Sequence, residues 1–149
     1  MFELHPRLQQ DTLVIGDFPL SRLLLMNDAG YPWFILVPRR AEICEIFELE
    51  YDDQVQLLKE SSQLAKVLSR KFEADKLNIA ALGNMVPQLH IHHIVRYRSD
   101  PSWPKPVWGL FPAKPYSPRA LQKTCVNLVE HLHDFIPDPD CPVAPRVCG

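Results

Sequence analysis

The amino-acid sequence predicts an α+β fold in which one long helix packs on a mostly antiparallel sheet. Three short apolar runs, 12–15, 21–26 and 33–37, are partly β-branched or aromatic and are bounded by glycine, proline or an Asn-Asp-Ala-Gly turn. Such punctuation is typical of strands joined by tight loops. The apolar residues then change to helical spacing, and two further strand-like runs follow. Strands that are followed by a separate helix favour the α+β class.

The long helix is expected from Asp52 to about Ala74. Val55, Leu58 and Leu68 belong to a set of apolar residues that recur at intervals of three, four or seven positions, with charged residues between them. This spacing predicts that the set forms one buried helix face. Asp52 is a residue type that accepts hydrogen bonds from free amides at a helix start, so we expect it to cap the helix.

The runs 77–82 and 88–98 are separated by Gly-Asn-Met-Val-Pro, and their proximity predicts an antiparallel pair of strands. After Arg98, closely spaced prolines exclude a regular helix. Ser117-Pro118 then predicts an N-cap and the first residue of a short amphipathic helix. The last residues, 136–149, are expected to be extended or mobile.

Length and composition predict one structural unit. A chain of 149 residues with 46% hydrophobic residues can bury one core. We expect a main domain over 1–110 and an extension over 111–149 that belongs to the same unit. The net charge of −2 comes from 16 basic and 18 acidic residues spread along the chain, without a basic stripe. A nucleic-acid polymer is therefore not an expected partner.

No segment approaches the ~20 apolar residues needed to cross a bilayer, and the first residues do not resemble a secretory signal. We therefore expect a cytoplasmic protein without a membrane partner. Cys44, Cys125, Cys141 and Cys148 form no Cys-x-x-Cys pair. Free thiols are expected, with Cys44 and Cys125 at apolar helix positions, and a disulfide between Cys141 and Cys148 is the alternative.

Three of the six histidines lie in Gln-Leu-His-Ile-His-His-Ile, at the start of the last strand-like run. Because side chains alternate along a strand, Gln88, His90 and His92 face one side and His93 faces the other, toward the helix. Alternate residues are ~7 Å apart in a strand, which allows their side chains to approach one phosphate. A neutral histidine can attack phosphorus, and a neighbouring imidazole, which can be cationic, can stabilise charge or protonate the leaving group. The pattern favours phosphoryl or nucleotidyl transfer.

This segment resembles the active-site strand of the histidine triad (HIT) family of nucleotide hydrolases and transferases, in which three histidines alternate with apolar residues. With Arg96 placed on the arginine that follows the triad in the fragile-histidine-triad branch, Gln88, His90 and His92 take the triad positions, and His90 is the implied nucleophile. The resemblance implies cleavage of a nucleoside monophosphoryl group, from a phosphoramidate or a dinucleoside polyphosphate, through a nucleotidyl-histidine intermediate. It also implies an antiparallel sheet of about five strands, a homodimer and no cofactor.

The resemblance extends upstream and covers about two thirds of the chain. Leu-Leu-Leu-Met-Asn-Asp-Ala-Gly is similar to the family segment in which a residue at the place of Asn27 contacts the ribose. Asn-Ile-Ala-Ala-Leu-Gly-Asn resembles the strand and turn before the triad, which implies phosphate contacts for Asn84 and Asn78. The sequence departs from the family pattern at Gln88 and at Trp33, where many members carry histidine. These departures put rate and substrate range in doubt more than reaction class.

Several alternatives remain at this stage. A second register takes His90 as the first triad position, His92 as the nucleophile and Ile94 as the third position. A nucleotide-binding sensor with little or no catalytic activity fits the two departures. A metal-dependent hydrolase is the third possibility, although His93 faces away from the other two imidazoles and a closed site needs about four ligands. Trp33 is most simply a core residue.

Overall fold

The computed structural model describes residues 1–142 of the chain and is built around an antiparallel sheet of six strands in the order β4-β5-β3-β2-β1-β6. The strands are β1 (Thr12–Asp17), β2 (Ser21–Met26), β3 (Trp33–Pro38), β4 (Lys76–Ala80), β5 (Ile91–Arg96) and β6 (Ile136–Pro137). The helices are α1 (Pro6–Asp11), the 3-10 helix η1 (Ile46–Glu48), α2 (Tyr51–Lys71) and α3 (Pro118–Val129). The expected α+β class is confirmed, and the two-residue β6 makes the sheet one strand wider than expected. Over 1–142, no helix combines the length and apolar character needed to cross a membrane.

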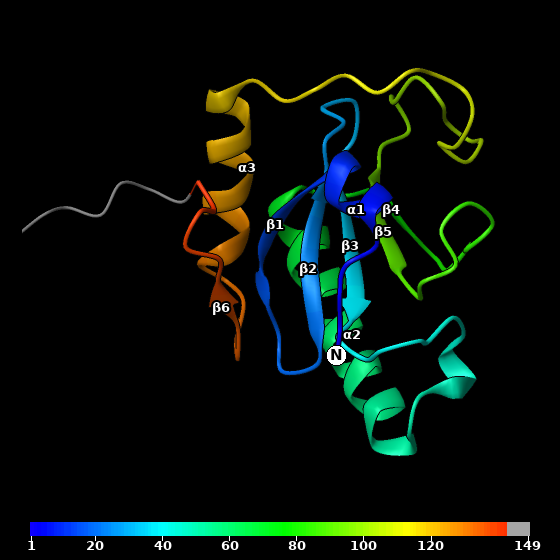
Figure 1. The fold of residues 1–149 in the computed structure, drawn as a ribbon. Coiled ribbons are helices and arrows are strands. Elements are labelled where there is room, and N and C mark those ends of the chain that lie inside the picture. The colour runs from blue at the N-terminus through cyan, green and yellow to red at the C-terminus, as the bar shows by residue number, and fades with distance from the viewer. Residues whose placement is uncertain (143–149) are drawn as a thin grey trace, which may run out of the picture.

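The sheet has a helix on each face, because α2 covers one side and α1 lies on the other (Figure 1). Strand alternation divides the buried side chains accordingly. Leu23, Leu25 and Phe34 belong to the hydrophobic cluster that includes α2 and α3. Leu24 and Ile35, their neighbours along the strands, belong to a second cluster that includes the N-terminal segment. Burying a leucine or isoleucine completely stabilises the fold by about 1.5–3 kcal/mol, so both faces contribute to stability.

β5 lies inside the sheet, between β3 and β4, and all of its residues are buried. The predicted antiparallel pairing of the two late runs is confirmed, with Ala80 of β4 opposite His92 of β5. On the other side, Ile35 of β3 is opposite His92. The strand begins at Ile91, so Gln88 and His90 lie in the segment that leads into it. A buried central strand gives the histidine segment rigid support.

The start of α2 differs from the prediction. Glu50 is the N-cap residue, and its side chain makes no capping hydrogen bond. The expected cap at Asp52 is wrong, because this residue lies inside the first turn together with Asp53. Carboxylates in the first turn still interact favourably with the positive end of the helix dipole.

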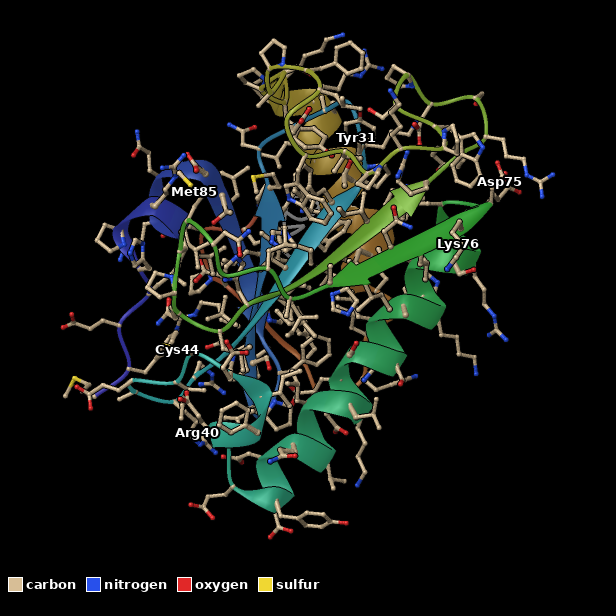
Figure 2. All side chains as sticks on the ribbon, turned by 90° about the vertical axis from the view of Figure 1, so that its right-hand side faces the viewer. Tyr31, Arg40, Cys44, Asp75, Lys76 and Met85 are labelled. Atoms are coloured by element: carbon tan, nitrogen blue, oxygen red, sulfur yellow. The ribbon has the colours of Figure 1, made fainter. Side chains whose placement is uncertain are left out.

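The predicted buried face of α2 is only partly right. Val55 and Leu58 are exposed, with 37% and 67% of their surface accessible. The helix instead buries Leu57, Leu64 and Leu68 against the sheet. In Figure 2, α2 runs along one face of the sheet, from the end near Arg40 to the end near Asp75. An exposed apolar strip therefore remains on the side of the helix that lies beside β4.

The predicted start of the C-terminal helix is confirmed. The Ser117 side-chain oxygen accepts a hydrogen bond from the Ala120 amide at 3.2 Å, and a proline follows the cap. Cys125 of this helix is buried, as expected, but Cys44 is exposed in the loop before η1, so its expected helical position is wrong. The alternative disulfide involves Cys148, which lies outside the described residues, as do residues 143–149 of the predicted extended tail.

Candidate functional site

Two of the clustered histidines share one face of the sheet, and the third faces the opposite side. The rings of His90 and His92 are 4.9 Å apart between centroids and meet edge to face. His93 points toward α2, where its Nε2 and the Ser61 hydroxyl oxygen are 2.7 Å apart. The predicted alternation is therefore confirmed, and His93 belongs to the packing between sheet and helix.

His90 and His92 line a cavity of about 330 Å³ on the face that carries α1. Its walls come from α1, the loop 82–86 and Trp108. Figure 2 shows Met85, at the tip of that loop, beside α1. The cavity is mostly apolar, with a few polar groups in one region, which is the usual character of a small-molecule site.

Hydrogen bonding assigns the tautomer of His90. Its Nδ1 is 2.7 Å from the backbone carbonyl oxygen of Gln88. A carbonyl oxygen only accepts hydrogen bonds, so Nδ1 carries the ring hydrogen and Nε2 keeps a free lone pair. Burial is the main influence on the ring and lowers the pKa of His90, although the Gln88 carbonyl works in the opposite direction. This is the protonation state that a nucleophilic imidazole requires.

His92 is held in the opposite tautomer. The indole Nε1 of Trp33 donates a hydrogen bond to His92 Nδ1 at 2.9 Å. Because an indole nitrogen only donates, His92 Nδ1 is the acceptor and the ring hydrogen lies on Nε2. Burial, followed by the nearby His90 and His93, lowers the pKa of His92 to about 3. His92 is therefore a neutral hydrogen-bond donor at pH 7.

The Gln88 side chain is directed to the N-terminal segment. Its Oε1 accepts from the His5 amide at 2.9 Å, and its Nε2 donates to the Glu3 carbonyl oxygen at 2.8 Å. These two bonds fix the segment that leads into α1. Gln88 reaches His90 only through its backbone carbonyl.

The three asparagines occupy different environments. Asn84 lines the cavity together with His90 and His92. The Asn27 side-chain oxygen accepts from the Tyr116 amide at 2.9 Å, and that of Asn78 accepts from Arg96 at 2.7 Å. Neither of these two is among the residues that line the cavity. The structure thus brings Asn84 to the histidines and leaves Asn27 and Asn78 in turn and strand contacts.

Sequence reasoning missed most of the cavity wall, including Trp33, Trp108, Arg7 and Asp11. Trp33 was expected in the core, and it is buried but also lines the cavity. The signal for a place in the cavity wall was its position in the sequence, where many members of the family that the chain resembles carry histidine. The ring of Trp108 lies 5.2 Å from that of His92 between centroids. Arg7 and Asp11 reach the cavity from α1, which has no clear periodic pattern in the sequence.

No group of three or more His, Cys, Asp or Glu side chains within residues 1–142 is arranged to hold a metal ion. The three clustered imidazoles do not converge on one point, because His93 lies on the opposite face of the sheet from His90 and His92. Asp11, the acidic residue among the described residues that line the cavity, forms an ion pair with Arg7 at 3.6 Å.

Comparisons with known proteins all point to one family. The family model of the HIT domain matches residues 7–99. A histidine triad protein from Marinobacter aquaeolei VT8 is 52% identical, with a TM-score of 0.87, over 89% of this chain and 96% of that one. One from Bradyrhizobium japonicum is 45% identical, with a TM-score of 0.86, over 87% and 97% of the two chains. One from Sinorhizobium meliloti 1021 is 44% identical, with a TM-score of 0.86, over 89% and 98%.

No curated protein matches the chain significantly. The family model nevertheless spans more than half of the sequence, and the solved structures match nearly their whole length at 44–52% identity. The matched region contains α1 from Arg7 onward and the histidine segment, and therefore all the residues that line the cavity except Trp108. The chain is a member of the HIT family.

Proposed function

We propose that this protein is a nucleotide hydrolase or transferase that cleaves a nucleoside monophosphoryl group through a nucleotidyl-histidine intermediate. The observation that carries the proposal is the pair of complementary imidazoles in one cavity. His90 has a free lone pair on Nε2, and His92 keeps a hydrogen on Nε2. One ring can attack phosphorus while the other donates to a phosphate oxygen.

In the first step, His90 Nε2 forms a bond to the α-phosphorus while the bond to the leaving group breaks. The ring becomes cationic, and its Nδ1–H points at the Gln88 carbonyl oxygen, which stabilises the positive charge. Water then attacks phosphorus and releases a proton to solvent, while the phosphorus–nitrogen bond breaks and its electron pair returns to His90. His92 holds the phosphate by a hydrogen bond throughout. These steps require no cofactor.

The three asparagines are the remaining candidates for substrate binding. Asn84 lines the cavity together with the two histidines, which supports a role for its side-chain amide as a donor to a phosphate. Asn27 and Asn78 are not among the described residues that line the cavity, and their side-chain oxygens accept hydrogen bonds from Tyr116 and Arg96. Of the three, Asn84 is therefore the residue that we assign to substrate binding.

His90→Ala tests the reaction. The variant should lose turnover of dinucleoside polyphosphates and form no nucleotidyl adduct, while its circular dichroism spectrum stays that of the parent. An adduct trapped on His92 would instead support the other register. Nucleotide binding by calorimetry, together with no turnover of any member of a broad substrate panel by the unmodified protein, would favour a nucleotide-binding sensor.

We also propose that the protein is a homodimer, formed through β4 and the exposed apolar side of α2 that carries Val55 and Leu58. β4 is an edge strand of the sheet. Next to it lies an apolar groove of about 450 Å³, whose walls include Val55 and Leu58 of α2 and Ile79 of β4. An exposed apolar patch beside a free strand edge is a typical interaction surface.

We further propose that the C-terminal extension, 111–149, belongs to the same structural unit as the main domain, because its residues Cys125 and Leu128 pack into the main core.

A further inference from the structure

The proposed reaction leaves open which leaving groups the site can expel. An amine cannot depart as an anion, because that anion is far too basic, so cleavage of a phosphorus–nitrogen bond requires a proton on the nitrogen. A phosphate or a nitrophenolate is a much weaker base and can depart without a proton. A general acid therefore matters greatly for the first class, where it contributes typically about 10²–10⁴-fold in rate.

His92 is not such an acid. Its Nδ1 is occupied by the Trp33 indole N–H at 2.9 Å, so a second proton there would set two N–H groups against each other. The ring is buried and makes edge contacts with His90 and with Trp108. A neutral imidazole gives up its one remaining N–H only at strongly alkaline pH. His92 can stabilise a phosphate by hydrogen bonding, but it has no proton to transfer.

The other polar groups around the cavity do not replace it. His5, a further imidazole near His90, is not among the described residues that line the cavity, and its Nδ1 accepts a hydrogen bond from the Arg7 amide at 3.1 Å. Gln88 holds the first triad position, where an imidazole could carry a proton, but an amide does not titrate, and both of its polar atoms are bound to backbone. Asn84 is likewise an amide. Arg7 and Asp11 form an exposed pair of a guanidinium and a carboxylate. Among the described residues that line the cavity, the only remaining titratable group is the nucleophile His90.

From this geometry, and resting on the function proposed above, we infer that the protein selects substrates whose leaving group departs as an anion without a proton. The nucleoside polyphosphate half of a dinucleoside polyphosphate is such a group, and an amine is not. In the favoured reaction, His90 Nε2 forms the bond to phosphorus and the phosphorus–oxygen bond breaks. Its electron pair stays on the departing phosphate, so that no proton is needed. Trp33 and Gln88 act as positioning residues that set this preference.

The test uses one nucleotidyl group, adenosine 5′-monophosphate, joined to a graded series of leaving groups. The series contains a p-nitrophenyl ester, a phenyl ester and an alkyl phosphoramidate. In the unmodified protein, kcat/KM should fall steeply as the leaving group becomes more basic. The phosphoramidate should react at least about 100-fold more slowly than the nitrophenyl ester, the lower end of the contribution of a general acid. Equal values for the two substrates would overturn the inference.

Two outcomes separate this inference from the proposed function. If rapid quenching with the nitrophenyl ester traps no nucleotidyl adduct on His90, the proposed function itself fails. If adducts form from the ester and from the phosphoramidate at the same rate, the proposed function stands and only the leaving-group preference is overturned. Adduct formation from these two substrates in the unmodified protein thus tests the proposed function and the leaving-group preference separately, without any variant.

A matched pair of variants tests the origin of the preference. Gln88→His places a titratable imidazole at the first triad position, and Gln88→Asn keeps an amide there. Because both variants disturb the bonds to the N-terminal segment, the readout is the ratio of kcat/KM for the phosphoramidate to that for the nitrophenyl ester. The histidine variant should raise this ratio at least tenfold, with an optimum that shifts toward acidic pH. The asparagine variant should not improve the phosphoramidate reaction. An equal improvement in both variants would contradict the assignment of Gln88.

Discussion

Two buried neutral imidazoles should make the stability of this protein unusually sensitive to mild acid. Burial lowers the pKa of His92 to about 3 and, against a smaller opposing influence of the Ile91 carbonyl, that of His93 to about 4, from an ordinary value of 6.5. Below pH 6.5 an unfolded chain binds protons at these positions and the folded protein does not. The free energy of unfolding should therefore fall as the pH decreases from about 6.5 toward 4.

The size of the effect follows from the two shifts. One pH unit of differential protonation is worth about 1.4 kcal/mol, so at pH 5 each histidine lowers the free energy of unfolding by about 2 kcal/mol relative to pH 7. The two together give about 4 kcal/mol, a large share of the 5–15 kcal/mol that is typical of a folded domain. Below pH 4 the loss from His93 levels off, because the folded protein also becomes protonated there.

Urea unfolding, followed by tryptophan fluorescence at pH 7 and pH 5, measures this difference. In His93→Gln the difference between the two pH values should shrink by about 2 kcal/mol, whatever the substitution does to stability at pH 7. The contributions of His92 and His90, whose pKa values burial also lowers, should remain. His131→Gln is the control, because it changes an exposed histidine and leaves both buried rings in place. The same unfolding free energy at both pH values in the unmodified protein would refute the claim that these rings are buried in their neutral form.

Further outcomes test the individual contacts. In Trp33→Phe, loss of the donor to His92 Nδ1, worth about 1 kcal/mol, should raise the His92 pKa by about one unit in an NMR titration, with an unchanged pKa refuting the bond. Gln88→Leu should speed amide exchange at His5 by about tenfold, because its acceptor and the second bond to the N-terminal segment are both lost. Leu58→Lys should convert the proposed dimer to a monomer in light scattering, whereas an unchanged mass would place the interface elsewhere. Ser117→Ala should cost about 1 kcal/mol in urea unfolding, as is usual for loss of an N-cap.

The sequence was informative where a single short-range rule decides the structure. The two-residue period of a strand predicted that His90 and His92 share a face and that His93 opposes them. The Ser-Pro pair predicted the start of α3, because a hydroxyl cap and a proline at the first helical position act within one turn. The class of the fold followed from the same kind of local pattern.

Other features depend on contacts that the sequence does not display. Trp33 and His92 are 59 positions apart, and Gln88 and His5 are 83 positions apart, so neither hydrogen bond could be inferred from spacing. The six residues of α1 bury only Leu8, too few for a recognisable period. Val55 fits the spacing of apolar residues on a buried helix face, but it is exposed because of the way α2 is rotated against the sheet.

The two bonds made by the Gln88 amide give the first few residues an unexpected importance. Deleting residues 1–5 would remove both backbone partners of that amide and would take away the support of the helix that carries Arg7 and Asp11. A shortened version that still folds would then have a widened and partly open pocket. Assays on such a version would measure weakened nucleotide retention, even though every histidine was intact.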